Sequence, residues 1–264
     1  MLPYVVTIFG FHIPTYGLMV AIAFLSAISL TGRMARQAGY NPETVLNLGV
    51  YCAMAGILGA KLTLVLVDLP DYLRDPGQLL SLSFLQAMGI FYGGFIAALL
   101  MAYVYMRKHS MPVLATADLF APGIALGHAI GRIGCFAAGC CWGDRCLRPW
   151  AVTFTNPAAH ELVGVPLNVP LHPTQLYESI SEFLILAVLL IRARRAHQPG
   201  ALIGLYVVMY SIVRFISDFF REPQQANPFG GPFNTAQWIS LGLIALVVVI
   251  WARTRGNRTV LAHS

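Results

Sequence analysis

The chain has 264 residues, of which 57% are hydrophobic and 11% are charged, and its mean hydropathy is +0.68. Soluble domains carry about 25% charged residues, so this composition excludes a disordered protein and argues against a soluble globular domain. The formal net charge of +6 would suit a nucleic-acid partner, but the positions of the basic residues indicate a different origin for it.

Seven apolar segments come close to the length of a membrane-crossing helix, which needs about 20 apolar residues. In chain order they cover residues 16–32, 45–67, 82–106, 114–136, 173–191, 201–220 and 236–252. We therefore predict an all-α polytopic membrane protein with about seven transmembrane helices, built as a single integral membrane domain over residues 1–264.

The basic residues divide unevenly between the connections. Most follow the first, third, fifth and seventh segments: Arg33, Arg36, Arg107, Lys108, Arg192, Arg194, Arg195, Arg253, Arg255 and Arg258. Fewer lie on the opposite side: Arg74, Arg145, Arg148 and Arg221. The positive-inside rule then places the N-terminus outside and the C-terminus in the cytoplasm. Topology thus explains the net charge, and no nucleic-acid partner is predicted.

The N-terminus has no Lys or Arg before its apolar residues, so no cleavable signal peptide is expected.

One connection is long. Residues 143–172, between the fourth and fifth segments, contain several prolines and are less apolar than their surroundings. Trp150–Thr155 alternates between apolar and polar residues, which predicts a short strand. We expect this connection to form a small extracytoplasmic cap, too small to be an independent domain.

Polar side chains inside the segments gather at similar depth. Charged groups in a membrane cost several kcal/mol, so they are candidates for function. The candidates in the predicted outer half are Tyr16, Lys61, Tyr92, His128, Arg132, His172, Gln175, Tyr177, Glu178, Arg214 and Asp218. Only Asp118 lies clearly in the inner half. This bias predicts one site that faces the outer leaflet.

Structural explanations compete for several of these residues. Arg214 and Asp218 are four residues apart and could neutralise one another. Lys61 could extend its amine outward to the headgroup region, which we favour over catalysis. Glu178 and Glu182 share a helix face and could pair with Lys61 or Arg214. The tyrosines 16 and 92 could be ordinary packing aromatics.

Arg132 has no acidic residue within four positions, so it needs an anionic partner from elsewhere. A phosphate is the anion that best accepts the bidentate hydrogen bonds of a guanidinium. His128 lies one turn away, beside glycines 123, 127 and 131, whose spacing allows a helix or a lipid to approach closely. These features predict a site for a phospholipid headgroup.

Four cysteines cluster after the fourth segment, at positions 135, 140, 141 and 146. Their spacing lacks the CxxC pairs of common zinc sites. A local disulfide and the packing of small residues both fit this pattern. We expect no metal site and no cofactor.

Six motifs together resemble the prolipoprotein diacylglyceryl transferases of bacterial inner membranes, nearly from end to end of the chain. They are YGLM at 16–19, LGAKL at 58–62, YGG at 92–94, GRIGCF at 131–136, HPTQLYE at 172–178 and RFISDFFREP at 214–223. The resemblance implies transfer of the diacylglyceryl group of phosphatidylglycerol to a cysteine thiol in a prolipoprotein signal peptide. A thioether forms and glycerol phosphate leaves. The implied partners are that membrane lipid and the signal peptide.

The resemblance also implies roles for individual residues. Arg132, Arg214 and Tyr16 match residues of the family's motifs. The set predicted to bind phosphatidylglycerol is Arg132, Arg214, Tyr16, Gly134, His172, Gln175, Tyr177 and Glu178. The predicted catalytic residues are His128, Tyr92 and Arg214. Tyr92 stands where the family pattern has a histidine, and Cys135 and Cys140 stand where it has an asparagine and an acidic residue. We therefore predict that His128 or Tyr92 assists deprotonation of the thiol.

Two other functions remain open at this point. A relative that binds phospholipid without transfer would lack release of glycerol phosphate. A transporter would need a polar path through the membrane, but the inner half of the predicted spans is nearly uncharged.

Overall fold

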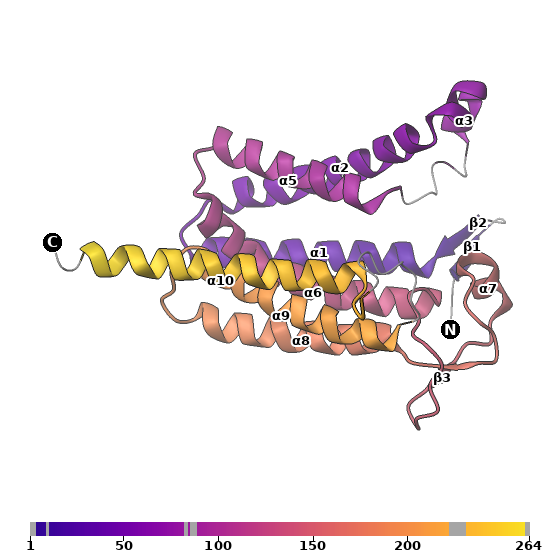
Figure 1. Cartoon of the computed structure of the whole chain (residues 1–264). Helices are drawn as coiled ribbons and strands as arrows, with labels where there is room; N and C mark the ends of the chain where they lie inside the picture. Colours follow the sequence, from indigo (N-terminus) through magenta and orange to yellow (C-terminus); the bar gives the residue numbers. More distant parts are fainter. Residues whose placement is uncertain (1–3, 9–10, 82–83, 85–88, 222–230, 262–264) are drawn as a thin grey trace. The chain divides into compact units, whose positions relative to one another are not determined.

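The computed structural model describes residues 4–8, 11–81, 84, 89–221 and 231–261, and it is mostly helical (Figure 1). The chain forms two compact units. One unit contains residues 1–30 and 117–264, and the other contains residues 31–116. We describe each unit by itself.

Within the part of the chain that the structure describes, five helices are long and apolar enough to cross a membrane. They cover Thr15–Gln37, Pro42–Val67, Val113–Ala138, Ala201–Phe220 and Thr235–Arg253. The first three of these are α1, α2 and α6. The fourth consists of α9 (Ala201–Ser217) followed by η2 (Asp218–Phe220), and the fifth lies within α10 (Thr235–Leu261). Two further predicted spans are also helical, as α5 (Phe91–Lys108) and α8 (Thr174–Ala193). The count of seven and the orientation remain predictions.

The predicted span 82–106 is not one continuous helix. Gly89 has a φ of +75°, and α5 starts only at Phe91. A side chain at Gly89 would come within 2.6 Å of the Ala60 backbone, so the chain here passes close to α2 instead of continuing a helix. Residues 82–83 and 85–88 lie outside the described residues.

In the second unit, α5 packs directly on α2. A Cβ atom at Gly59 would lie 2.4 Å from the Ala97 Cβ, and one at Gly94 would lie 2.6 Å from the Gly56 carbonyl oxygen. Close contact of this kind is typical of glycine-lined helix interfaces. The motifs LGAKL and YGG thus serve to pack two helices. The unit also contains α3 (Leu69–Arg74) and η1 (Pro76–Leu80).

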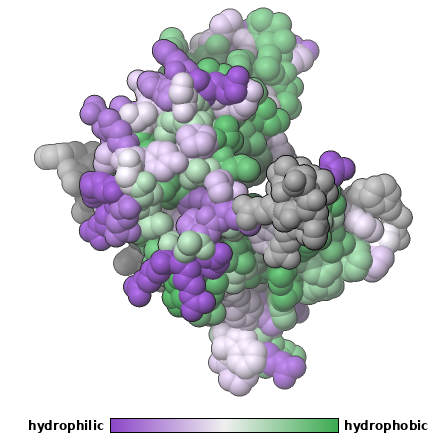
Figure 2. Space-filling view, turned by 90° about the vertical axis from the view of Figure 1, so that its left-hand side faces the viewer, coloured by the Kyte–Doolittle hydropathy of each residue, from purple (hydrophilic) through white to green (hydrophobic). Residues whose placement is uncertain are grey.

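In the first unit, α8 packs against α9, and α9 against α10 (Figure 1). The buried core between the helices is Ala121, Ala125, Ile185, Leu189, Leu202 and Tyr206. The N-terminal half of α1 packs on α6 through glycines. A Cβ at Gly127 would lie 3.2 Å from the Ala27 Cβ, and one at Gly134 would lie 2.8 Å from the Met19 Cβ. Figure 2 faces the left-hand side of Figure 1 and shows hydrophilic residues on that side, next to hydrophobic ones.

The connection 143–172 has a small structured core of its own. Strands β3 (Val152–Thr153) and β4 (Pro170–Leu171) pair antiparallel, which confirms a short strand within Trp150–Thr155. Helix α7 (Pro157–Val163) lies between them. Phe154, Ala159, Val165 and Leu171 are buried together. The place of this connection relative to the membrane remains a prediction.

A second antiparallel pair of strands, β1 (Tyr4–Ile8) with β2 (Phe11–Pro14), precedes α1 and was not expected.

Asp118, the one charged residue of the predicted inner half, caps α9. Its carboxylate accepts hydrogen bonds from the backbone N–H groups of Gly200, at 2.7 Å, and Ile203, at 2.8 Å. The side chain is buried. A carboxylate at a helix N-terminus satisfies unpaired N–H groups and interacts favourably with the helix dipole. Asp118 therefore has a structural role, in linking α6 to the start of α9.

We expect Asp118→Ala to destabilise the protein by about 1–3 kcal/mol, because it leaves two partly buried N–H groups at the start of α9 without their acceptor. The apparent unfolding temperature in detergent should fall measurably. The control is Asp71→Ala, which removes an exposed carboxylate paired only with the exposed Arg74 at 3.5 Å. Equal unfolding temperatures for the two variants would contradict the capping role.

Candidate active site

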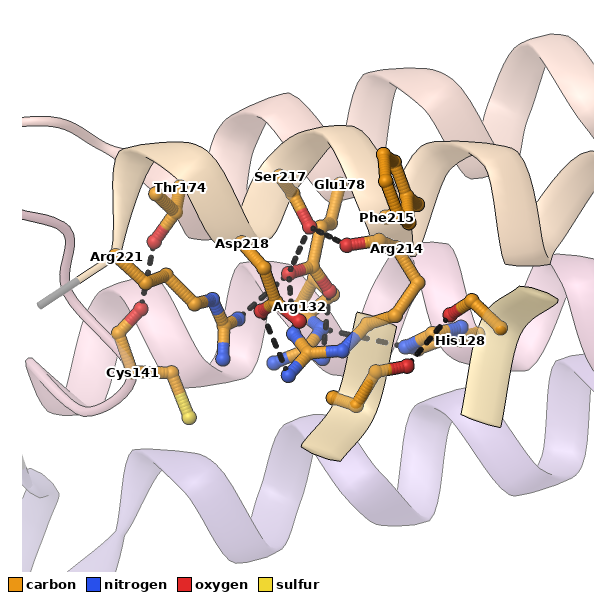
Figure 3. A network of polar contacts seen from close by, with 12 residues as sticks. His128, Arg132, Cys141, Thr174, Glu178, Arg214, Phe215, Ser217, Asp218 and Arg221 are labelled. Atoms are coloured by element: carbon orange, nitrogen blue, oxygen red, sulfur yellow. Dashed lines mark hydrogen bonds and ion pairs between the residues drawn. The ribbon is translucent and has the colours of Figure 1, made fainter. Parts of the chain in front are cut away.

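One buried carboxylate holds three guanidinium groups in the first unit (Figure 3). Glu178 of α8 is 1% exposed. Its Oε2 atom lies 2.6 Å from Arg132 Nη2, and its Oε1 atom lies 2.6 Å from Arg221 Nη2 and 3.5 Å from Arg214 Nη1. These arginines come from α6, from α9 and from the residue after η2. Glu178 therefore joins three segments that are far apart in the sequence.

A second carboxylate completes the group. Arg214 Nη2 lies 2.9 Å from Asp218 Oδ1, so the pairing that their spacing allowed is present. Ser217 also donates a hydrogen bond to Glu178 Oε1, at 3.3 Å. Three guanidinium groups thus lie against the carboxylates of Glu178 and Asp218, so the cations outnumber the carboxylates that they contact directly. This arrangement favours an anionic ligand.

Arg132 finds on α8 the partner that its own helix lacks. Its contact with Glu178 satisfies one side of the guanidinium, and the side chain keeps 15% exposure. Next to it, Gly131 has open space, since nothing lies within 4 Å of where its Cβ would be. Arg132 is thus held in place and remains accessible.

His128 is fixed between Arg132 and a second buried acid. Arg132 Nε donates to His128 Nε2 at 3.2 Å, and His128 Nδ1 lies 3.0 Å from Oε1 of Glu182, which is fully buried. An arginine can only donate, so Nε2 must be the acceptor and Nδ1 carries the proton toward Glu182. The carboxylate then orients the imidazole as an acid does in a catalytic triad. Glu182 thus pairs with His128.

Tyr16 reaches α6 through Gly134. A Cβ at Gly134 would lie 3.7 Å from Tyr16 Cδ2, so the missing side chain allows the start of α1 to approach two residues from Arg132. The structure shows a packing role for Gly134, and lipid binding by Gly134 and Tyr16 remains a prediction.

A cavity of about 370 Å³ adjoins the network. It is lined by Trp150, His172, Tyr177, Ser181, Val213, Ile216, Ser217 and Phe220. The Tyr177 hydroxyl accepts a hydrogen bond from Trp150 Nε1 at 2.8 Å and lies 3.0 Å from His172 Nδ1. Ser217 belongs to both the cavity wall and the Glu178 network, so the two features meet there.

Gln175 and Thr174 hold the loop that follows α6. Gln175 Nε2 donates to the Cys140 carbonyl at 2.6 Å, and Thr174 Oγ1 donates to the Cys141 carbonyl at 2.8 Å. Both side chains are fully buried. In this loop, hydrogen bonds with Cys135 and Cys140, together with the charges of Arg132 and Arg221, lower the pKa of the Cys141 thiol. In the structure, Gln175 positions the backbone of the loop that follows α6.

Two candidates lie in the other compact unit. Tyr92 is 56% exposed, and its ring meets Phe91 edge-on at 5.8 Å between centroids. Lys61 donates to the Phe84 carbonyl, and its amine lies 4.6 Å from the centre of the Phe84 ring. The role of Tyr92 in the reaction remains a prediction.

Sequence reasoning missed Arg221 as a site residue and assigned Glu182 no definite partner. Arg221 lies in the connection after the sixth predicted span, where a basic residue has no obvious partner in the sequence. Its spacing was a usable signal, because it follows Asp218 by three residues and Arg214 by seven, which places all three on one face of a continuing helix.

Comparisons with known proteins agree on one family. The family model described as prolipoprotein diacylglyceryl transferase matches residues 3–253. The phosphatidylglycerol–prolipoprotein diacylglyceryl transferase of Clostridium tetani is 35% identical over 255 residues, covering 95% of this chain and 97% of its own. The protein of that name from Ruegeria pomeroyi is 31% identical over 264 aligned residues, covering 89% of each chain.

Proposed function

The chain belongs to the prolipoprotein diacylglyceryl transferase family, and we propose that it transfers the diacylglyceryl group of phosphatidylglycerol to the lipobox cysteine thiol of a prolipoprotein. The product is a thioether, and glycerol phosphate is released. The observation that carries this proposal is the cationic network around Glu178. Family membership also favours a transferase over the transporter considered above.

Arg132 is proposed to bind the lipid phosphate. The phosphodiester of phosphatidylglycerol carries one negative charge, and the three guanidinium groups outnumber the two carboxylates that they contact directly. A phosphate accepts two parallel hydrogen bonds from a guanidinium, as a carboxylate does. The lipid would therefore compete with Glu178 and His128 for the N–H groups of Arg132, while Arg214 and Arg221 keep Glu178 in place.

The chemistry is a displacement at a primary carbon. The peptide thiolate attacks the glycerol carbon, the carbon–oxygen bond to phosphate breaks, and its electron pair goes to the phosphate oxygen. Preorganised cations stabilise the charge that develops on such a leaving group. Arg132 and Arg214 are proposed to do this.

His128 is proposed as the base that takes the thiol proton. Its Nε2 lone pair is occupied by Arg132 Nε, so movement of Arg132 toward a phosphate would free it. Glu182 would then stabilise the imidazolium that forms. In this scheme the base becomes available only when lipid is bound, which limits deprotonation of the thiol to the loaded enzyme.

The cavity beside Ser217 is proposed to take an apolar part of a substrate, with His172 and Tyr177 in its wall. We further propose that the site opens to the outer leaflet of the bacterial inner membrane. The support is the basic residues, which the positive-inside rule assigns mainly to the cytoplasmic side.

The assay uses purified protein in detergent with phosphatidylglycerol and a peptide that carries a lipoprotein signal cysteine. Mass spectrometry should detect a gain of one diacylglyceryl group on the peptide. Retention of phosphatidylglycerol without any mass gain would instead support a lipid-binding relative that has lost transfer.

In this assay we expect His128→Gln to lower kcat about 10²–10⁴-fold, the range that general base catalysis supplies. The pH dependence of kcat should also change, which a purely structural role would not cause. His109→Gln, at an exposed histidine of the second unit, is the control and should match the wild type. Tyr92→Phe tests the other candidate, and normal activity in both His128→Gln and Tyr92→Phe would rule out the predicted bases.

A further inference from the structure

Three cysteine thiols gather where α6 ends. The sulfur atoms of Cys135, Cys140 and Cys141 all lie within 4.8 Å of one another. Cys135 is in the last turn of α6, and the other two follow the helix. The cluster plays no part in the reaction described above.

The backbone turn explains how adjacent cysteines reach back to the helix. The N–H groups of Gly139 and Cys140 both donate to the Cys135 carbonyl, at 2.9 and 3.1 Å. Gly139 and Cys141 have positive φ angles of 82° and 60°. Such a left-handed turn is common after a helix, but it is unfavourable for a non-glycine residue such as Cys141. The turn brings both thiols over Cys135, which the sequence spacing alone did not suggest.

The loop is also held from the opposite side. The hydrogen bonds from Thr174 and Gln175 of α8 to the carbonyl groups of Cys141 and Cys140 are made by fully buried side chains. The cluster is therefore preorganised by backbone contacts that do not use the thiols. None of the three thiols is in a disulfide, and Cys140 and Cys141 are partly exposed. The Cys140 thiol donates a weak hydrogen bond to the Cys135 carbonyl oxygen, at 3.7 Å, which a metal ion would replace.

The spacing fits one metal ion. Metal–thiolate bonds are about 2.3 Å long, so sulfur atoms around one ion lie about 3.8–4.0 Å apart in tetrahedral or trigonal geometry. The sulfur–sulfur distances here are at most 4.8 Å, so they would shorten by about 1 Å or less when an ion binds. Among the described residues, the group contains no fourth Cys, His or carboxylate ligand, so a bound ion would be three-coordinate or would take an exogenous fourth ligand.

The neighbouring charges favour such a site. Three thiolates leave a monovalent or divalent ion with a net negative charge, and Arg132 and Arg221 both act electrostatically on Cys141. Figure 3 shows the Cys141 side chain at the same end of the network as Arg221. Thiolate ligands select soft ions such as Cu(I) and also Zn(II), over Mg(II) or Ca(II).

We propose that Cys135, Cys140 and Cys141 form a three-thiolate binding site for a soft metal ion of the Cu(I) or Zn(II) class. The bound ion ties the loop after α6 to the helix that carries Arg132. It is a structural element beside the active site, and no step of the transfer reaction passes through it.

The test titrates the full-length protein in detergent, under reducing and anaerobic conditions, with Zn(II) and Cu(I) in separate experiments against a competing chelator. We expect one ion per chain in at least one titration, with thiolate-to-metal charge-transfer absorption. Failure of both ions to bind stoichiometrically would overturn the proposal. A disulfide within the cluster of the isolated protein would also overturn the proposal. It would appear as an intact mass lower by two hydrogens, and peptide mapping would locate it.

Serine variants assign the ligands. Cys135→Ser, Cys140→Ser and Cys141→Ser should each weaken metal binding by more than about 100-fold, since even changes behind the ligands cost 10–100-fold. Cys52→Ser, in α2, is the matched control and should bind as the wild type does. Size-exclusion chromatography checks that each variant is folded. Unchanged affinity in folded cluster variants would contradict the assignment.

Discussion

Replacing Arg132 with alanine is expected to lower kcat/KM for phosphatidylglycerol about 10²–10³-fold. The variant loses a preorganised cation at the leaving phosphate, and removal of one such group typically has an effect of this size. The measurement is the transfer of diacylglyceryl to the signal peptide, followed by mass spectrometry.

The matched variants separate charge from geometry. Arg132→Lys keeps the positive charge but loses the two-pronged contact, so we expect an intermediate loss of about 10-fold or more. Arg148→Ala, at an exposed position in the connection 143–172, removes an arginine that is not one of the three on Glu178 and should leave transfer unchanged. Transfer at the wild-type rate in Arg132→Ala would remove Arg132 from the proposed mechanism.

Replacing Glu178 with glutamine should have the second large effect, and one of a different kind. The change raises the net charge of the network by one unit and removes the shared partner of three arginines. Breaking a buried ion pair destabilises a protein by about 3–5 kcal/mol, so the apparent unfolding temperature should fall. We expect kcat to fall about 100-fold or more, because the cations lose their positions.

The effect of Glu178→Gln on KM distinguishes a positioning role from lipid binding by the carboxylate itself. The arginines remain and gain free N–H groups, so affinity for phosphatidylglycerol should stay the same or increase while kcat falls. Glu161→Gln, at an exposed position in α7, is the control. A large rise in KM with normal kcat would show that Glu178 contacts the lipid directly.

Interactions within one helix could be predicted from the sequence. The spacing of Arg214 and Asp218 allowed for their ion pair. The length of the apolar segments predicted seven helical spans, and five helices of the described residues are long and apolar enough to cross a membrane. Both depend on local periodicity. The shared depth of polar residues also predicted that residues of α6, α8 and α9 belong to one site.

Pairings between helices could not be predicted in the same way. Glu178 had several cationic candidates at similar depth, and the rotation of α8 decides that it faces α6 and α9. That rotation depends on packing of residues such as Ile185 and Leu189, which periodicity does not specify. The cysteine turn depends on a positive φ at Cys141, a conformation that a non-glycine residue rarely signals in a sequence.

The charge of the Glu178 network also bears on product release. The substrate phosphodiester has one negative charge, whereas glycerol phosphate, a monoester, carries nearly two near neutral pH. The guanidinium groups that stabilise the charge developing on the leaving phosphate therefore face a product of higher charge than the lipid that they bound. Release of glycerol phosphate must break these stronger contacts, so departure of the product should contribute to the limit on turnover.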